Sequence, residues 1–361
     1  MNAPWRIIEG DCREALRAMP EGSARCCVTS PPYWGLRDYG HDGQLGLEPT
    51  PEQYVANMVE VFREVRRVLA DDGTLWLNLG DSYAADRGGT TPPAQTVSGG
   101  VHGVGGVDER RGQKDGYNAT RDCRRYGLKH KDLVGIPWMV AKALQAGVFF
   151  CADCEQESIA TARLDDGRLL CRQCGAAQPV DLEPEDRWYL RADIIWSKPN
   201  PMPESVRDRP TKAHEYVFLL AKSDRYFYDF EAVKEAAVST HGSGNGFVRD
   251  ARLSFDGRGN EQPWADVGGL RNRRSVWNIA TRPFAGAHFA TMPTDLVEPC
   301  VMAGSATGDT VLDPFAGAGT VGLVANRLGR AFVGVELNPQ YAAIARERIT
   351  GDAPLFNTRT A

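Results

Sequence analysis

Long apolar segments are missing from this chain, and so is a basic leader. No stretch approaches the roughly 18 uncharged apolar residues that a membrane-spanning helix requires. The first residues, Met1 to Asp11, lack the positively charged start and apolar run of a secretory signal. We therefore expect a cytoplasmic protein with no membrane partner.

The chain also lacks an excess of positive charge. Its formal net charge is -5, which argues against a uniformly basic surface but leaves room for a local basic face that contacts phosphates. One basic stretch runs from Arg110 to Lys131, and a second contains four arginines: Arg271, Arg273, Arg274 and Arg282. Each stretch is either a DNA contact or a solvated loop surface.

What is present is the composition of a large globular α/β domain. Of 361 residues, 42% are hydrophobic and 25% charged, which suits one core with insertions. Apolar patterns predict strands at Trp5–Glu9, Arg25–Thr29, Thr74–Leu79, Trp188–Lys198, Glu215–Lys222, Thr310–Leu312 and Ala331–Val335. They predict helices at Cys12–Met19, Tyr54–Leu69, Leu133–Ala146, Thr294–Met302, Val321–Leu328 and Pro339–Ile349, with Asp71-Asp72-Gly73 ending the second. This alternation implies a Rossmann-like, doubly wound, mostly parallel sheet.

A glycine-rich turn follows one of the last expected strands. Gly317, Gly319 and Gly322 have the spacing G-x-G-x-x-G, and Glu336 ends the next strand. Such glycines permit a tight turn and a close backbone approach to a ligand, while the acid can accept hydrogen bonds from ribose hydroxyls. Tight packing of helix on strand is the alternative. The pattern alone does not say which adenosine-containing cofactor binds.

The expected strand Arg25–Thr29 runs directly into Ser30-Pro31-Pro32-Tyr33. An exocyclic amine on an aromatic base is a weak nucleophile, and two acceptors aimed at its hydrogens would localise its lone pair. The Ser30 hydroxyl and a backbone carbonyl of the rigid Pro-Pro turn can supply them. Tyr33 can stack on a base extruded from a duplex. A plain proline turn that ends the strand is the alternative.

These two motifs resemble those of β-class DNA amino-methyltransferases, the N4-cytosine and N6-adenine type. The resemblance lies in Thr29 to Trp34 and in Asp313 to Thr320, with the catalytic motif first in the chain. It implies an S-adenosylmethionine-dependent methyltransferase fold and a flipped base in double-stranded DNA. Serine at the first catalytic position mostly accompanies cytosine N4 in this family, so Ser30 implies N4-methylcytosine, with N6-methyladenine as the alternative.

The resemblance also implies roles for single residues. Phe315, Gly317 and Gly319 would shape the cofactor pocket, and Thr320 would contact the methionine carboxylate. Asp313 would lie beside the amino-acid moiety and Glu336 would bind the ribose. Asp11 resembles the acid near the cofactor adenine, although an Asp before a helix is also an ordinary N-cap.

Four of the nine cysteines form two C-x-x-C pairs, Cys151 with Cys154 and Cys171 with Cys174. Two such turns typically complete a tetrahedral structural zinc site, so we expect an inserted zinc ribbon, with reduced unligated thiols as the alternative. Cytosine-C5 methylation would need a cysteine nucleophile, but we expect Cys300 to be a core residue of a helix, and Cys26 and Cys27 to lie within a buried strand.

These observations divide the chain into eight segments. We expect residues 1–83 to form the catalytic half of the core, 84–132 a flexible insertion, 133–150 a core helix, 151–175 the zinc ribbon, 186–230 core strands, 231–285 a candidate target-recognition insertion, 286–350 the cofactor-binding half and 351–361 a tail. The two insertions would close on the duplex and read base edges, with Arg271, Arg273 and Arg274 as DNA contacts.

Three other functions are alternatives to this one. A dinucleotide-dependent oxidoreductase would leave the Ser-Pro-Pro-Tyr turn without a role. A non-catalytic zinc-ribbon DNA-binding protein with a relic core is a second alternative, and methylation of RNA or protein is a third. The sequence leaves open whether a cognate restriction endonuclease accompanies the enzyme.

Overall fold

The computed structural model describes residues 4–36, 40–41, 43–84, 128–151, 153–154, 156–163, 169–171, 176–178, 187–236, 270–282 and 291–352. Its centre is an eight-stranded sheet with the order β1 (Trp5–Glu9), β14 (Ala331–Glu336), β13 (Thr310–Asp313), β2 (Ala24–Thr29), β3 (Leu69–Leu79), β9 (His214–Ala221), β8 (Tyr189–Ser197) and β12 (Val276–Asn278). Neighbouring strands are parallel except that β9 runs antiparallel to both β3 and β8. This confirms the mostly parallel, doubly wound sheet.

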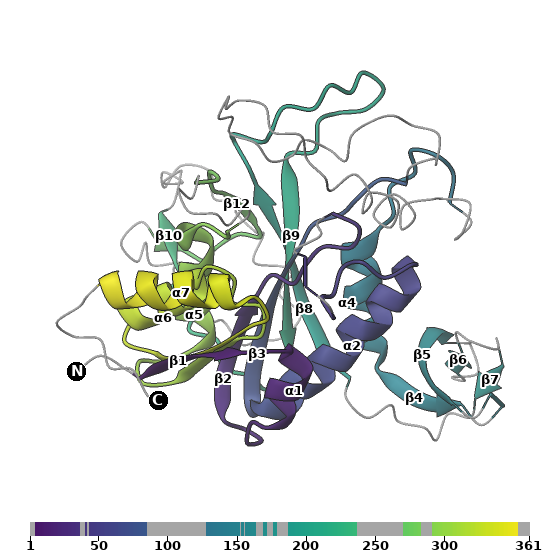
Figure 1. Ribbon diagram of the computed structural model, residues 1–361. Helices are drawn as coiled ribbons and strands as arrows, with labels where there is room; N and C mark the ends of the chain where they lie inside the picture. The colour runs from purple at the N-terminus through teal and green to yellow at the C-terminus, as the bar shows by residue number, and fades with distance from the viewer. Residues whose placement is uncertain are drawn as a thin grey trace, which may run out of the picture.

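Helices cover both faces of the sheet (Figure 1). On one face lie α1 (Cys12–Arg17), α2 (Pro51–Val68) and α4 (Ile136–Ala146), and on the other α5 (Thr294–Gly304), α6 (Thr320–Arg327) and α7 (Pro339–Asp352). Strand β2 serves both cores, because successive side chains alternate: Cys27 packs with the first set of helices and Cys26 with the second. Cys26, Cys27 and Cys300 are at most 1% exposed, which confirms them as core residues.

Several expected boundaries were wrong: α2 begins at Pro51 and not at Tyr54, because Thr50 is its N-cap, and the starts of β3 and α4 also moved. The backbone is already extended at Leu69, the C-cap of α2, and β3 begins there, so Asp71-Asp72-Gly73 lies inside the strand instead of forming a turn. A register shift against β2 accommodates these residues, and the two acids find partners in Arg25 and Lys222. Helix α4 begins at Ile136 and not at Leu133, because Asp81 accepts hydrogen bonds from the backbone N–H groups of Gly135 and Ile136 at its first turn.

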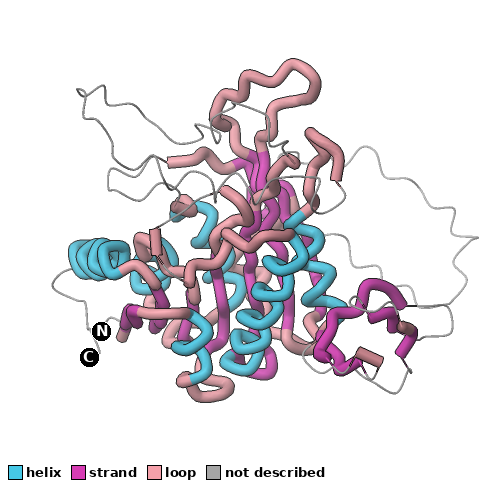
Figure 2. The backbone as a smooth tube through the Cα atoms, turned by 45° about the vertical axis from the view of Figure 1, so that its right-hand side comes forward, coloured by secondary structure: helices cyan, strands magenta, loops and turns pink. Residues whose placement is uncertain are grey.

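A small antiparallel sheet stands to one side of the central sheet (Figure 2). Its order is β4 (Val148–Cys151), β5 (Gln156–Arg163), β6 (Leu169–Cys171) and β7 (Ala177–Gln178). A separate two-stranded sheet pairs β10 (Glu235–Ala236) with β11 (Leu270–Arg271).

Among the described helices, none is both long and apolar enough to cross a membrane.

Candidate active site

The two sequence motifs meet at the carboxyl edge of the sheet. Strands β2 and β13 are parallel neighbours, with Cys27 opposite Leu312, so the turns that follow them emerge side by side. The Thr29 hydroxyl donates to Asp313 Oδ1 at 2.7 Å, and both side chains are at most 2% exposed. Ligands of doubly wound sheets bind where the chain connections diverge at such an edge. The sheet therefore brings together the turn at residues 30–33, predicted to be catalytic and called the catalytic turn, and the turn at residues 314–319, predicted to bind the cofactor and called the cofactor turn.

The three glycines of the G-x-G-x-x-G motif have two different structural roles. Gly317 and Gly319 have φ values of 52° and 74°, which L side chains rarely adopt, so they shape the turn itself. A Cβ on Gly322 would lie 2.5 Å from the Phe332 ring and 2.6 Å from Ile349, so this glycine lets α6 approach β14 and α7. The structure therefore shows the tight turn at Gly317 and Gly319 and the tight helix packing at Gly322, while the approach of a ligand to this turn stays a prediction.

Two carboxylates flank the cofactor turn. Glu336 accepts from the backbone N–H of Gly317 at 2.7 Å and from that of Asn338 at 2.9 Å, and burial raises its pKa. Asp313 accepts from the Phe315 N–H at 3.1 Å, and burial raises its pKa to about 7. Burial disfavours both anions, and a ligand that brings hydroxyl or ammonium donors to them would relieve that cost.

Asp11 and Thr320 already have partners within the protein. The register of β1 on β14 pairs Glu9 with Glu336, so the loop that carries Asp11 starts beside Glu336. Asp11 is the N-cap of α1, and its side-chain bonds to Arg13 lower its pKa. Thr320, which is 5% exposed, accepts from Arg348 at 2.9 Å. Both are positioned beside the cofactor turn, and Asp11 is a cap as well.

A chain of hydrogen bonds surrounds the catalytic turn. The Ser30 hydroxyl donates to the Tyr33 hydroxyl at 3.3 Å, and the Tyr33 hydroxyl donates to Glu215 Oε2 at 2.7 Å. Asn78, at the end of β3, donates to the Tyr33 hydroxyl at 2.8 Å and to Ser30 Oγ at 3.3 Å. The Tyr33 ring also packs closely on Gly80, where a Cβ would lie 2.5 Å from it.

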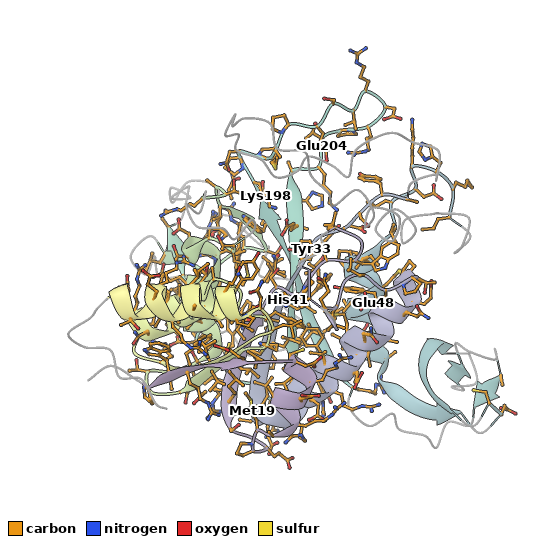
Figure 3. The ribbon with its side chains drawn as sticks, in the orientation of Figure 1. Met19, Tyr33, His41, Glu48, Lys198 and Glu204 are labelled. Carbon is orange, nitrogen blue, oxygen red and sulfur yellow. The ribbon has the colours of Figure 1, made fainter. Side chains whose placement is uncertain are left out.

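Glu215 and Lys198 are site residues that the sequence reasoning missed. Lys198 forms an ion pair with Glu215 Oε1, and both side chains are only 17% exposed. The Lys198 ammonium also lies 4.3 Å from the centre of the Trp196 ring. Figure 3 shows Tyr33 and Lys198 near one another at the upper end of the sheet. The available signal was Glu215, an acid near the start of β9 that precedes a run of apolar and aromatic residues.

A second pair of ionisable groups lies beyond Glu215. Asp81 follows β3, and burial raises its pKa despite the backbone N–H groups from which it accepts. Burial lowers the pKa of Lys212, whose ammonium is buried without a hydrogen-bond partner among the described residues. Electrostatic attraction links Lys212 to both Asp81 and Glu215. Several buried ionisable groups, Asp81, Lys212 and Glu215, therefore lie at this edge of the sheet.

The three arginines expected to contact DNA lie away from this network. Arg271 and Arg274 both pair with Glu235, at 2.9 Å and 2.6 Å. The Arg273 guanidinium lies 4.5 Å from the centre of the Trp277 ring. They gather beside the β10–β11 pair and the start of β12, and Val276–Asn278, within the segment assigned to target recognition, adds a strand to the core sheet.

The structure describes the cysteine module only in part. Cys151 ends β4, Cys154 follows in the connection to β5, and Cys171 ends β6, while Cys174 lies outside the described residues. Among the residues that are described, no group of three or more His, Cys, Asp or Glu side chains gathers as a metal site. The four-cysteine zinc site therefore stays a prediction.

Comparisons with known proteins agree with this geometry. Residues 24–347 match the family model described as DNA methylase, of the N6 and N4 type. The chain is 43% identical over 346 residues to the type II methyltransferase M.Cfr9I of Citrobacter freundii, covering 96% of this chain and 88% of the relative. It is 42% identical over 344 residues to M.SmaI of Serratia marcescens, covering 95% and 90%.

Solved structures share the fold. The PvuII DNA methyltransferase (cytosine-N4-specific) superposes with a TM-score of 0.54 at 17% identity, covering 99% of this chain and 95% of the other. A protein of Thermus thermophilus, described as a DNA modification methylase and complexed with S-adenosyl-L-methionine, gives a TM-score of 0.52 at 22% identity and covers 99% and 100%.

Proposed function

Because this chain belongs to the DNA methylase family, and is an S-adenosylmethionine-dependent DNA methyltransferase of the N4/N6 class, we propose that it methylates the exocyclic N4 of cytosine in duplex DNA. Ser30 carries the proposal. It stands where the family most often has serine for cytosine and aspartate for adenine, and its hydroxyl proton is directed at Tyr33. Its remaining lone pair can accept from a substrate amine.

The catalytic turn supplies the second acceptor. Pro32 O accepts from the Tyr54 hydroxyl at 3.0 Å, whereas no group in the described part of the chain donates to Pro31 O. Ser30 Oγ and Pro31 O would accept the two amine hydrogens and draw the nitrogen toward tetrahedral geometry. The lone pair so localised would point at the cofactor side, where catalysis rests on positioning. Tyr33, whose ring packs on Gly80 and whose hydroxyl donates to Glu215, would contact the extruded base.

The residues beside β13 and β14 fit the cofactor. S-adenosylmethionine supplies an electrophilic methyl group on a sulfonium when bound. Glu336 would accept from the ribose hydroxyls, because Gly317 and Asn338 donate to different oxygens of its carboxylate and each oxygen has a second lone pair. Asp313 would face the methionine ammonium and Thr320 the carboxylate, while Asp11 would lie near the adenine. Phe315, Gly317 and Gly319 would form the pocket wall.

The product nucleoside tests the base assignment. Purified protein is incubated with mixed-sequence duplex DNA and isotope-labelled S-adenosylmethionine, and the DNA is digested for mass spectrometry. We expect label in N4-methylcytosine. Label in N6-methyladenine would correct the base, and label in RNA or protein alone, or cofactor binding without transfer, would refute the proposal. A palindromic substrate whose methylation also protects DNA from a restriction endonuclease would identify a cognate partner.

We also propose that the small sheet is a structural zinc ribbon. Strands β5 and β6 are antiparallel, with Arg163 opposite Leu169 and Ala160 opposite Cys171. Strand β6 therefore runs back toward the end of β5 that follows Cys154, with Cys151 opposite Gln156 and Cys171 opposite Ala160 four residues along the same strand. Metal analysis of the purified protein should give about one zinc per chain, released in the Cys171→Ser variant. A metal-free protein with an intact fold would refute the ribbon.

The arginines near β11 are proposed as DNA contacts. Neutralising Arg271 or Arg274 should weaken DNA binding equally for all sequences and lower the slope of log affinity against log salt by about one. The matched control is Arg17→Gln, because Arg17 is also an exposed arginine in an ion pair, with Glu60, on α1. Equal salt slopes for the wild-type and Arg274→Gln proteins would show that Arg274 serves Glu235 and does not contact DNA.

A further inference from the structure

The hydrogen bonds around Ser30 all point the same way. The Ser30 hydroxyl donates to Tyr33, and the Tyr33 hydroxyl donates to Glu215, so the chain of donors ends on a carboxylate. Asn78 donates to both hydroxyl oxygens through its amide nitrogen. Lys198 neutralises the far oxygen of Glu215. A chain of this polarity can pass a proton in one direction, from Ser30 to Glu215.

Methylation of an amine creates a proton that must leave. The nitrogen forms its bond to the methyl carbon while the carbon–sulfur bond breaks, and the bonding pair stays on sulfur. The nitrogen then carries the positive charge and one hydrogen too many. The product leaves as a neutral amine only after a base has taken that proton.

We propose that Glu215 is the terminal proton acceptor of the reaction, reached through Ser30 and Tyr33. The amine proton passes to Ser30 Oγ, the Ser30 hydroxyl proton passes to the Tyr33 oxygen, and the Tyr33 proton passes to Glu215 Oε2. The sulfonium and the carboxylate are replaced by a thioether and a carboxylic acid, so charge balances. This inference rests on the proposed function. Glu215 does not contact the amine. It acts on the amine only through the hydroxyls of Ser30 and Tyr33, and in this sense it is a positioning residue.

Lys198 keeps Glu215 ionised, so that its carboxylate can accept a proton. Burial alone would raise the pKa of Glu215, but the ion pair with Lys198, and the hydrogen bonds from Tyr33 and Asn78, lower it. Among the described residues, Lys212 and His214 also interact electrostatically with Glu215, and Asp81 interacts with Lys212. Burial, and then the nearby charge of Lys212, lower the pKa of His214 and so favour its neutral imidazole.

The pH dependence of single-turnover methylation tests the relay. With S-adenosylmethionine saturating at every pH, the wild-type rate should be independent of pH from about 6 to 9, since Glu215 is a carboxylate throughout. Lys198→Met removes the counter-ion, so burial should raise the Glu215 pKa, and the rate should be low at about pH 6 and recover as pH rises. Lys198→Arg keeps the charge and should keep the flat profile. Glu215→Gln should be about a hundredfold slower at every pH.

Matched measurements separate the possible failures. Lys222→Met removes a comparably buried lysine from the opposite end of β9 and should leave the rate unchanged. All variants should bind S-adenosylhomocysteine like the wild type. A flat profile for Lys198→Met, or a Glu215→Gln rate within about threefold of wild type, would overturn the relay. Labelled N6-methyladenine would refute the cytosine proposal and leave the relay standing, because both amines shed a proton.

Discussion

The cofactor half and the catalytic half of the site are built in different ways. Around the cofactor turn, positive-φ glycines and backbone N–H groups set the geometry, and Gly317, Gly319 and Glu336 lie within one strand–helix–strand unit. The catalytic half takes side chains from the ends of β2, β3 and β8 and from the start of β9, joined by hydrogen bonds. Substitutions in the first half should therefore change cofactor affinity or folding, and those in the second should change rate.

Ser30→Ala should have the largest effect. It removes one of the two acceptors proposed for the amine and the first link to Tyr33, so the single-turnover rate should fall about 10²–10³-fold, the usual cost of losing one preorganised polar partner. Quenched-flow transfer of labelled methyl to duplex DNA measures it. A loss below about tenfold would mean that the turn is structural, as the alternative interpretation of the motif holds.

Gly322→Ala should sharpen the distinction within the cofactor half. The new methyl group would collide with Phe332 and Ile349, and overpacking of this kind costs about 1–3 kcal/mol. Urea unfolding measures the loss, and S-adenosylhomocysteine affinity of the folded variant should be unchanged. Gly351→Ala is the control, because its Cβ would meet nothing within 4 Å in α7. Weaker cofactor binding in the folded Gly322→Ala variant would give this glycine a direct role.

Asp313 should make cofactor binding depend on pH. Burial raises its pKa to about 7 in the cofactor-free protein, and the methionine ammonium would favour its ionised form. S-adenosylhomocysteine should then bind about tenfold more tightly at about pH 8 than at about pH 6, since one pKa unit corresponds to a factor of ten. Titration calorimetry should show this gain in the wild type and a weaker, flat affinity in Asp313→Asn.

Stability should show the opposite dependence on pH. The Asp313 pKa lies above its unfolded value, so the cofactor-free protein binds an extra proton when folded between roughly pH 4 and 7. Its free energy of unfolding should therefore decline over that window as pH rises, and Asp313→Asn should remove this decline. Equal slopes for the wild-type and Asp313→Asn proteins would contradict the buried titration.

Asp11→Ser should have the smallest effect. Serine also caps helices well, so the N-cap of α1 is kept while the carboxylate is lost. If the carboxylate accepts from the cofactor adenine, the affinity for S-adenosylhomocysteine should fall about fivefold, the value of one hydrogen bond of about 1 kcal/mol. Affinity equal to wild type would reduce Asp11 to its capping role.

Local patterns predicted the cofactor half better than the catalytic half. The turn at Gly317 and Gly319 and the acid at Glu336 follow from short-range spacing, and the family comparisons confirm the DNA methylase assignment. The bond between Tyr33 and Glu215 joins positions 182 residues apart, which no local pattern encodes. Strand β12 is three residues long, too short for periodicity. The start of β3 was misjudged because a register shift absorbed its turn-like residues.

The affinity of Ser30→Ala for S-adenosylhomocysteine tests the division between the halves most directly. Titration calorimetry would compare it with the wild type, on the same preparation that is used for the rate. We predict affinities within about a factor of two, because Ser30 bonds to Tyr33 and Asn78 and to none of the described residues around the cofactor turn. An affinity weaker by about tenfold would contradict the account and show that the two halves form one cooperative unit.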